Sequence, residues 1–185
     1  MTTIIAIPGS LRRDSFNLRL LQAAQSVTPA DCRLEIETLN EIPLYNGDIE
    51  KDAGIPSAVQ SLKDRIADAD GLLIASPEYN NSLPGVLKNA VDWLSRPAAD
   101  QARVFRGRPV AIIGATPGGM GTALSQTAWL PVLRTLGTKP WFGGSLYVSR
   151  AHLVFDENGA IQDESLRERL RNFIAGFAAY AAGER

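Results

Sequence analysis

Short apolar runs recur along the chain and alternate with segments in which apolar residues are spaced three or four apart. Runs of this kind, four to six residues long, are typical of strands buried on both faces of a parallel sheet. Four of them are predicted strands, at residues 4–7, 34–39, 72–75 and 110–114. A fifth strand is predicted within residues 140–148, where Gly143 and Gly144 interrupt the apolar pattern.

The segments between these runs have helical periodicity. One apolar face is formed in each of four segments, by Leu18, Leu21, Ala24 and Val27, by Val59, Leu62, Ile66 and Ala69, by Val86, Leu87, Ala90, Val91 and Leu94, and by Leu166, Leu170, Phe173, Phe177 and Tyr180. Pro84 precedes the third of these helices and suits its first turn. A further helix is predicted for residues 121–136, kinked or split at Pro131 because proline has no N–H to donate.

Alternating strands and helices predict an α/β fold, a three-layer sandwich built on a parallel sheet. The chain has 185 residues, which fits a single domain over residues 1–185. Its longest irregular stretches are residues 40–56 and 96–108. Loops this long in a compact domain are often functional, or they form an oligomer interface.

The composition narrows the range of functions. A net charge of −1 without a basic block argues against nucleic acid as a partner, and also against a strongly acidic carrier protein. The single cysteine, Cys32, and the single histidine, His152, predict neither a disulfide nor a metal site. The sequence shows no apolar run of about 20 residues and no signal-like start, so we expect a cytoplasmic protein without membrane contact.

The loop after the first predicted strand reads "PGSLRRDSFN" and leads into the first predicted helix. The N-terminal end of a helix favours a phosphate group, and Ser10, Arg12 and Ser15 offer hydroxyls and a positive charge. The loop lacks the residues of a Walker A motif and of a dinucleotide fingerprint. The competing interpretation is that Ser15 or Asp14 merely caps the helix.

A second polar loop follows the third predicted strand in "SPEYNNSLPGVLKNAVDWLSR". Loops after neighbouring parallel strands meet at one edge of the sheet, where ligands bind. Tyr79 offers a surface for a flat ring, and Asn80 and Asn81 offer amides that recognise ring nitrogens and carbonyls. A simple turn is the alternative, since Pro, Asn and Ser are common turn residues.

These two motifs together resemble the NADPH-dependent FMN reductase family, in its chromate and quinone reductase branch. The resemblance implies a flavodoxin-like fold of strand order 2-1-3-4-5, bound FMN, NADPH or NADH as co-substrate, and a homodimer or homotetramer. It implies that the phosphate loop contains Ser10, Arg12, Ser15, Phe16 and Asn17, and that the ring loop contains Pro77, Glu78, Tyr79 and Asn80. A turn formed by Thr116, Pro117, Gly118 and Gly119 is expected to border the pyrimidine edge of the flavin.

The family implies two-step (ping-pong) hydride transfer from NAD(P)H through FMN to quinones, azo dyes, chromate-type oxyanions or free flavin. The cofactor carries this chemistry, so no side chain is assigned a catalytic role. A flavodoxin-type electron carrier without enzymatic activity is the alternative, and a nucleotide-binding regulatory subunit is a third possibility. Trp93 is expected in the core or in a subunit interface close to the flavin, because Trp93 and Leu94 are too large to leave exposed together.

Overall fold

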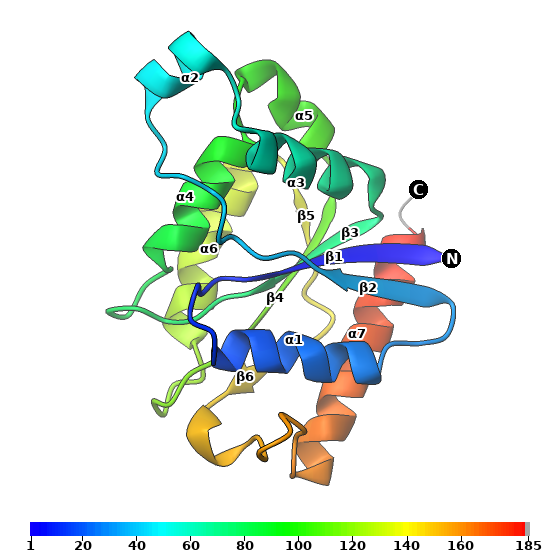
Figure 1. Ribbon diagram of the computed structural model, residues 1–185. Coiled ribbons are helices and arrows are strands. Elements are labelled where there is room, and N and C mark those ends of the chain that lie inside the picture. The colour runs from blue at the N-terminus through cyan, green and yellow to red at the C-terminus, as the bar shows by residue number, and fades with distance from the viewer. Residues whose placement is uncertain (184–185) are drawn as a thin grey trace.

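The computed structural model describes residues 1–183 and contains a parallel sheet of strand order β2-β1-β3-β4-β5, which confirms the predicted flavodoxin-like α/β fold (Figure 1). A sixth short strand, β6, pairs with β4 outside this path. The strands are β1 (Thr2–Pro8), β2 (Cys32–Ile36), β3 (Gly71–Ala75), β4 (Pro109–Ala115), β5 (Lys139–Pro140) and β6 (Tyr147–Val148).

Helices cover both faces of the sheet (Figure 1). One face carries α1 (Phe16–Ser26) and α7 (Glu164–Gly183), and the other carries α3 (Ser57–Asp68), α4 (Gly85–Leu94) and α6 (Ala123–Leu136). Successive residues of a strand point to opposite faces, so Ile4 packs with the first group of helices and Ile5 with the second. Burial on both faces explains why these strands read as continuous apolar runs.

The two long irregular stretches contain short helices of their own. They hold α2 (Gly47–Ala53), the 3₁₀ helix η1 (Ala98–Asp100) and α5 (Gln101–Val104), and a second 3₁₀ helix, η2 (Ala151–Leu153), follows β6. No residue of α2 is buried. An ion pair between Arg96 and Glu50, 3.0 Å long, attaches α2 to the chain just after α4. Polar contacts therefore hold this part of the molecule.

Two predicted strands differ from the structure. The second ends at Ile36 rather than at residue 39, because Leu39 leaves the sheet and packs into the core from a loop, where it is 2% exposed. The predicted fifth strand is two short pieces, β5 and β6, separated by residues 141–146. Trp141 turns out of the sheet to pack edge-on against Phe173, with ring centroids 4.9 Å apart.

The helix α6 runs through Pro131 without a break, so the predicted split is wrong. Proline removes the hydrogen bond that the carbonyl of Thr127 would otherwise accept. Both Thr127 and Pro131 are exposed, so water can reach that carbonyl.

Trp93 is fully buried within its own chain and Leu94 is 1% exposed, so neither side chain calls for a subunit partner. The indole N–H of Trp93 donates to the carbonyl of Pro43 (2.9 Å), and its ring packs edge-on against Tyr45. Of the two places expected for Trp93, the structure shows the core and not a subunit interface. Its function in this structure is to hold the segment before α2 against α4.

Candidate functional site

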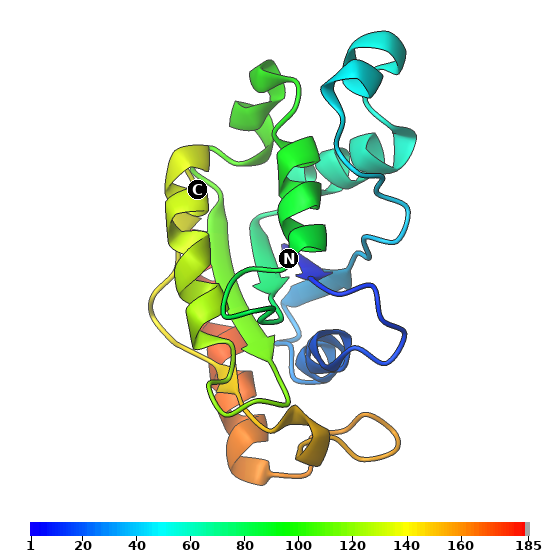
Figure 2. The same ribbon diagram turned by 90° about the vertical axis from the view of Figure 1, so that its left-hand side faces the viewer.

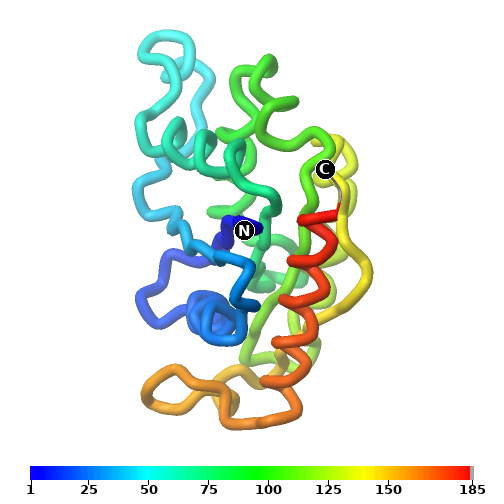
Figure 3. The backbone as a smooth tube through the Cα atoms, turned by 90° about the vertical axis from the view of Figure 1, so that its right-hand side faces the viewer, coloured from blue at the N-terminus to red at the C-terminus, as the bar shows by residue number. Residues whose placement is uncertain are grey.

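Three loops follow β1, β3 and β4 on one side of the molecule (Figure 2), away from the two termini (Figure 3). These are the carboxyl ends of three adjacent parallel strands, where α/β proteins bind ligands. The hydroxyl of Tyr79, in the loop after β3, donates to Oγ of Ser10, in the loop after β1, at 3.3 Å. The structure thus brings together the two motifs that the sequence singled out.

The loop after β1 has the features of an anion site. Oγ of Ser15 accepts the backbone N–H of Leu18 (3.4 Å), so Ser15 caps α1 as the competing interpretation expected. The N–H of Leu18 is occupied by this cap, whereas the N–H groups of Phe16 and Asn17, in the same first turn, have no acceptor within a helix and remain available to a ligand. Arg12 is exposed and forms no ion pair within residues 1–183, whereas Asp14 pairs with Arg19 at 3.7 Å. The local charge therefore favours a phosphate.

Asn17 joins this loop to the end of β4. Its side chain is 2% exposed and makes two hydrogen bonds to Ala115, accepting from the backbone N–H and donating to the carbonyl, each 3.0 Å long. Both the nitrogen and the oxygen of its amide therefore take part in this contact. The neighbouring Phe16 stacks on Phe155, with ring centroids 6.4 Å apart.

The loop after β3 is a tight turn. Tyr79 and Ser82 exchange two backbone hydrogen bonds of 3.1 and 3.0 Å, and the residues between them, Asn80 and Asn81, have φ angles of 50° and 60°. Positive φ at both central positions defines a type I′ turn, which asparagine tolerates better than most residues. The turn interpretation is thus correct for the backbone, and the same turn presents Tyr79, which is 43% exposed.

Glu78 connects this turn to α6. Its carboxylate accepts the backbone N–H groups of Leu124 (2.9 Å) and Ser125 (3.1 Å), in the first turn of the helix. The residue at the usual capping position, Thr122, makes no side-chain cap, so a carboxylate from another strand end replaces it. The sequence motif marked Glu78, but it did not reveal this partner.

A buried polar cluster behind the turn was not predicted. Oγ of Ser76 lies 2.8 Å from Oγ of Ser125 and accepts the indole N–H of Trp129 at 2.9 Å. The hydroxyl of Ser125 also donates to the carbonyl of Pro77 (2.9 Å). These bonds fix the end of β3 to α6. No local pattern in the sequence signals them, because the partners are about 50 residues apart.

The third loop follows β4 and is anchored by η2 and the end of β6. The backbone of Thr116 donates to Val148 and accepts from Ala151, both at 3.0 Å, and the carbonyl of Gly118 accepts from Arg150 at 3.1 Å. Pro117, Gly118 and Gly119 remain exposed between these anchors. All three predicted segments of the site therefore lie at the same edge of the sheet.

The described part of the chain shows its shifted pKa values elsewhere. The hydrogen bond from Arg96 lowers the pKa of Glu50, and burial raises the pKa of the Cys32 thiol. Among residues 1–183, no three or more His, Cys, Asp or Glu side chains are grouped as a metal site requires. Within the same range no helix has the length and apolarity needed to cross a bilayer. The three loops offer positioning groups and hydrogen-bond donors.

Comparison with known proteins agrees with this geometry. The sequence profile of a family described as NADPH-dependent FMN reductase matches residues 2–153. A 2-hydroxy-1,4-benzoquinone reductase of a Burkholderia species is 41% identical over 182 residues, which span 98% of this chain and 97% of the relative. An NAD(P)H-dependent FMN reductase of Pseudomonas aeruginosa is 40% identical, over 91% of this chain and 89% of its own.

A solved structure has the same fold. The flavoenzyme NAD(P)H:(acceptor) oxidoreductase FerB from Paracoccus denitrificans superposes with a TM-score of 0.88 at 33% identity, covering 100% of this chain and 99% of its own. Fold and site define a flavodoxin-like flavoenzyme. The chain belongs to the NADPH-dependent FMN reductase family, and it is an oxidoreductase that uses FMN and NAD(P)H.

Proposed function

We propose that the protein reduces quinones with NAD(P)H, using FMN held at the three loops. The contact between Tyr79 and Ser10 supports this assignment most directly, because it joins the loop proposed for the phosphate to the loop proposed for the ring. Relatives named quinone reductase support the choice of acceptor. Bound FMN supplies the hydride and electron transfer between the two substrates.

The residues of the loops fit an anionic, flat cofactor, and we assign them as follows. The first turn of α1 holds the phosphate, with help from Ser10, Ser15 and Arg12, while Phe16 and Asn17 contribute their backbone N–H groups. The ring lies against the loop formed by Pro77, Glu78, Tyr79 and Asn80, in which Tyr79 presents its exposed face. In the loop formed by Thr116, Pro117, Gly118 and Gly119, the N–H groups of the two glycines stabilise negative charge at the pyrimidine edge.

The exposed face of the flavin binds both substrates in turn. NAD(P)H binds first and leaves before the acceptor enters, which is a ping-pong order and requires neither a nucleophile nor a metal. Azo dyes, chromate-type oxyanions and free flavin are further acceptors that such an open site admits. The proposal places the protein in the cytoplasm, where NAD(P)H is supplied.

Purified protein tests this function. We expect one FMN per chain, identified by chromatography after heat release, and steady NADPH oxidation when a small quinone is added. Parallel lines in double-reciprocal plots at several quinone concentrations would support the ping-pong order. Flavin without NAD(P)H oxidation would indicate an electron carrier instead, and the absence of flavin would indicate a regulatory subunit.

Replacing Arg12 with alanine is expected to weaken FMN binding about ten- to a hundredfold, whereas Arg13→Ala should change it little. Loss of a hydrogen bond to a charged group costs about 1.5–3 kcal/mol, which corresponds to that range of affinity. Both arginines are exposed and adjacent, so they form a matched pair. Fluorescence titration of the apoprotein with FMN measures both variants, and equal dissociation constants would refute the assigned direction of the loop.

We also propose that the protein is a homodimer or homotetramer, and that the segment around α2 contributes to its interface. Leu44, Tyr45 and Ile49 are 81%, 38% and 43% exposed there, although all three are large and apolar. Exposed groups of this kind often mark protein contacts. Light scattering should give a mass of two or four times 20.0 kDa. Leu44→Asp should lower that mass if the segment is the interface.

A further inference from the structure

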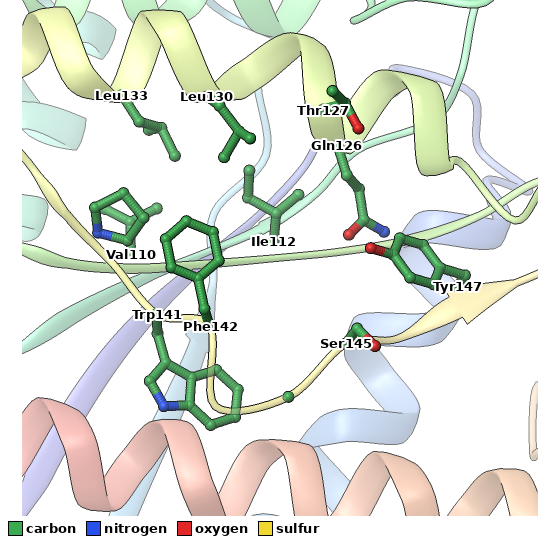
Figure 4. A pocket seen from close by; sticks show the side chains of 12 residues that line it. Val110, Ile112, Gln126, Thr127, Leu130, Leu133, Trp141, Phe142, Ser145 and Tyr147 are labelled. Carbon is green, nitrogen blue, oxygen red and sulfur yellow. The ribbon is translucent and has the colours of Figure 1, made fainter.

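The helix α6 begins without a cap from the residue that precedes it. N-cap residues usually have an extended backbone, which lets the side chain accept an N–H of the first turn. Thr122 occupies this position in the left-handed conformation, with φ of 69° and ψ of 20°, and makes no such bond. It is fully buried, and its Oγ1 accepts a hydrogen bond from Gln126 at 3.1 Å. The amide of Gln126 points from α6 toward Tyr147 (Figure 4) and also donates to the carbonyl of Leu146. The hydroxyl of Thr122 is therefore bonded within the core and not to the start of the helix.

The left-handed backbone of Thr122 is unusual for a residue with a branched Cβ. Among residues 1–183, the other non-glycine residues with positive φ are Asn80, Asn81 and Arg150. The two asparagines form the turn of the candidate site, and the N–H of Arg150 donates to the carbonyl of Gly118 in the third loop (3.1 Å). Conformations of this kind persist where surrounding contacts enforce them, and they gather at functional sites. The start of α6 shares this feature with the loops of the site.

Glu78 supplies the cap that Thr122 does not. The backbone N–H groups of Leu124 (2.9 Å) and Ser125 (3.1 Å) both donate to one oxygen of its carboxylate, Oε2. A negative charge at this end of a helix is also favoured by the helix dipole. The hydroxyl of Ser125 donates to the carbonyl of Pro77 at 2.9 Å. Two successive residues at the base of the asparagine turn are thus attached to the start of α6.

We propose that Glu78 is a positioning residue, whose carboxylate holds the loop carrying Tyr79 against α6 and so determines where the flavin ring lies. This inference rests on the proposed placement of FMN at the three loops. The two backbone hydrogen bonds between Tyr79 and Ser82 shape the turn, but both lie within it. The bonds between Glu78 and α6 fix the base of the turn to the rest of the domain. The carboxylate is occupied by the helix, so its effect on the flavin is indirect.

A helix cap of this kind requires an acceptor of the right reach rather than a charge. Because one oxygen accepts both N–H groups, the amide oxygen of a glutamine can accept them in the same way. We therefore expect Glu78→Gln to bind FMN within about threefold of the natural protein, and Glu78→Ala to bind it about tenfold more weakly, as loss of a cap implies. Fluorescence titration with FMN measures both variants.

Asp163 provides a matched control outside the three loops. Its carboxylate also accepts two N–H groups at the start of a helix, those of Ser165 (2.8 Å) and Leu166 (3.3 Å) in α7. Asp163→Ala and Glu78→Ala should both lower the melting temperature by about 3–6 °C, since each loses one cap. Only Glu78→Ala should weaken FMN binding. The comparison separates a loss of overall stability from a displaced loop.

The visible circular dichroism of bound flavin provides a second readout, because it reports the surroundings of the ring. At saturating FMN we expect an altered spectrum in Glu78→Ala and the natural spectrum in Glu78→Gln and Asp163→Ala. Unchanged affinity and an unchanged spectrum in Glu78→Ala would refute the positioning role. FMN binding as weak in Glu78→Gln as in Glu78→Ala would refute it too, because the charge would then be what FMN requires.

Arg12→Ala distinguishes this inference from the proposed function. If Arg12→Ala weakens FMN binding and Glu78→Ala does not, the flavin lies at the loops but Glu78 does not position it. If neither variant changes the affinity, FMN binds elsewhere and both proposals fail.

Discussion

Replacing Asn17 with alanine is expected to lower the free energy of unfolding by about 2–4 kcal/mol and to weaken FMN binding. The substitution removes both hydrogen bonds to Ala115 and leaves its buried N–H and carbonyl without partners. Each such group costs about 1–3 kcal/mol when unpaired. For a chain of this size the melting temperature should fall by about 5–15 °C.

The effect on FMN arises because Asn17 connects two of the three loops. Its backbone lies in the first turn of α1, and its amide holds Ala115, which directly precedes the loop beginning at Thr116. Without this link the two loops are no longer fixed relative to each other, and we expect at least tenfold weaker binding in a fluorescence titration.

Two further variants make the test specific. Gln22→Ala, on the exposed face of the same helix, should leave stability within about 0.5 kcal/mol of the natural protein. Asn17→Asp should not restore stability, because a carboxylate has no hydrogen to donate to the carbonyl of Ala115. If Asn17→Ala unfolds at the same denaturant concentration as the natural protein, the link is not structural.

The sheet could be predicted from the sequence where burial and strand pairing coincide. Every residue of β3 is buried, and the apolar run at residues 72–75 predicted this strand. Leu39 shows the limit of this prediction, because it is equally buried but packs from a loop. An apolar residue alone does not indicate whether it will be buried in a strand or in a loop. The prediction of a single strand within residues 140–148 is wrong for the same reason, since Trp141 leaves the sheet to pack against α7.

The sequence predicted that the loops of the candidate site lie together, but it did not predict the contacts within them. Parallel strands bring successive loops to one edge, which the contact between Tyr79 and Ser10 bears out. The partners of Asn17 and Glu78 are backbone groups 98 and about 46 residues further along the chain. Contacts to a distant backbone leave no periodic pattern, and any residue type can supply them. The sequence therefore marked these side chains without revealing what they bind.

The largest loss is expected for Gly114→Ala, at the end of β4. An added Cβ would lie 2.1 Å from Oγ1 of Thr122 and 2.4 Å from the carbonyl oxygen of Ser76, far inside contact distance. Neither neighbour can move freely. Thr122 is fully buried, has a φ of 69° and accepts a hydrogen bond from Gln126, while Ser76 is held by Ser125 and Trp129.

Forcing a methyl group into this contact should destabilise the fold by about 3 kcal/mol, at the upper end for overpacked cores. It should also displace the loops that begin at Pro77 and Thr116, since both follow directly from the strands pushed apart. We therefore expect Gly114→Ala to be purified largely without FMN. Gly85→Ala is the matched control, because nothing lies within 4 Å of its added Cβ and alanine favours a helix. Native stability and full FMN content in Gly114→Ala would show that the loops adapt independently of the strand ends.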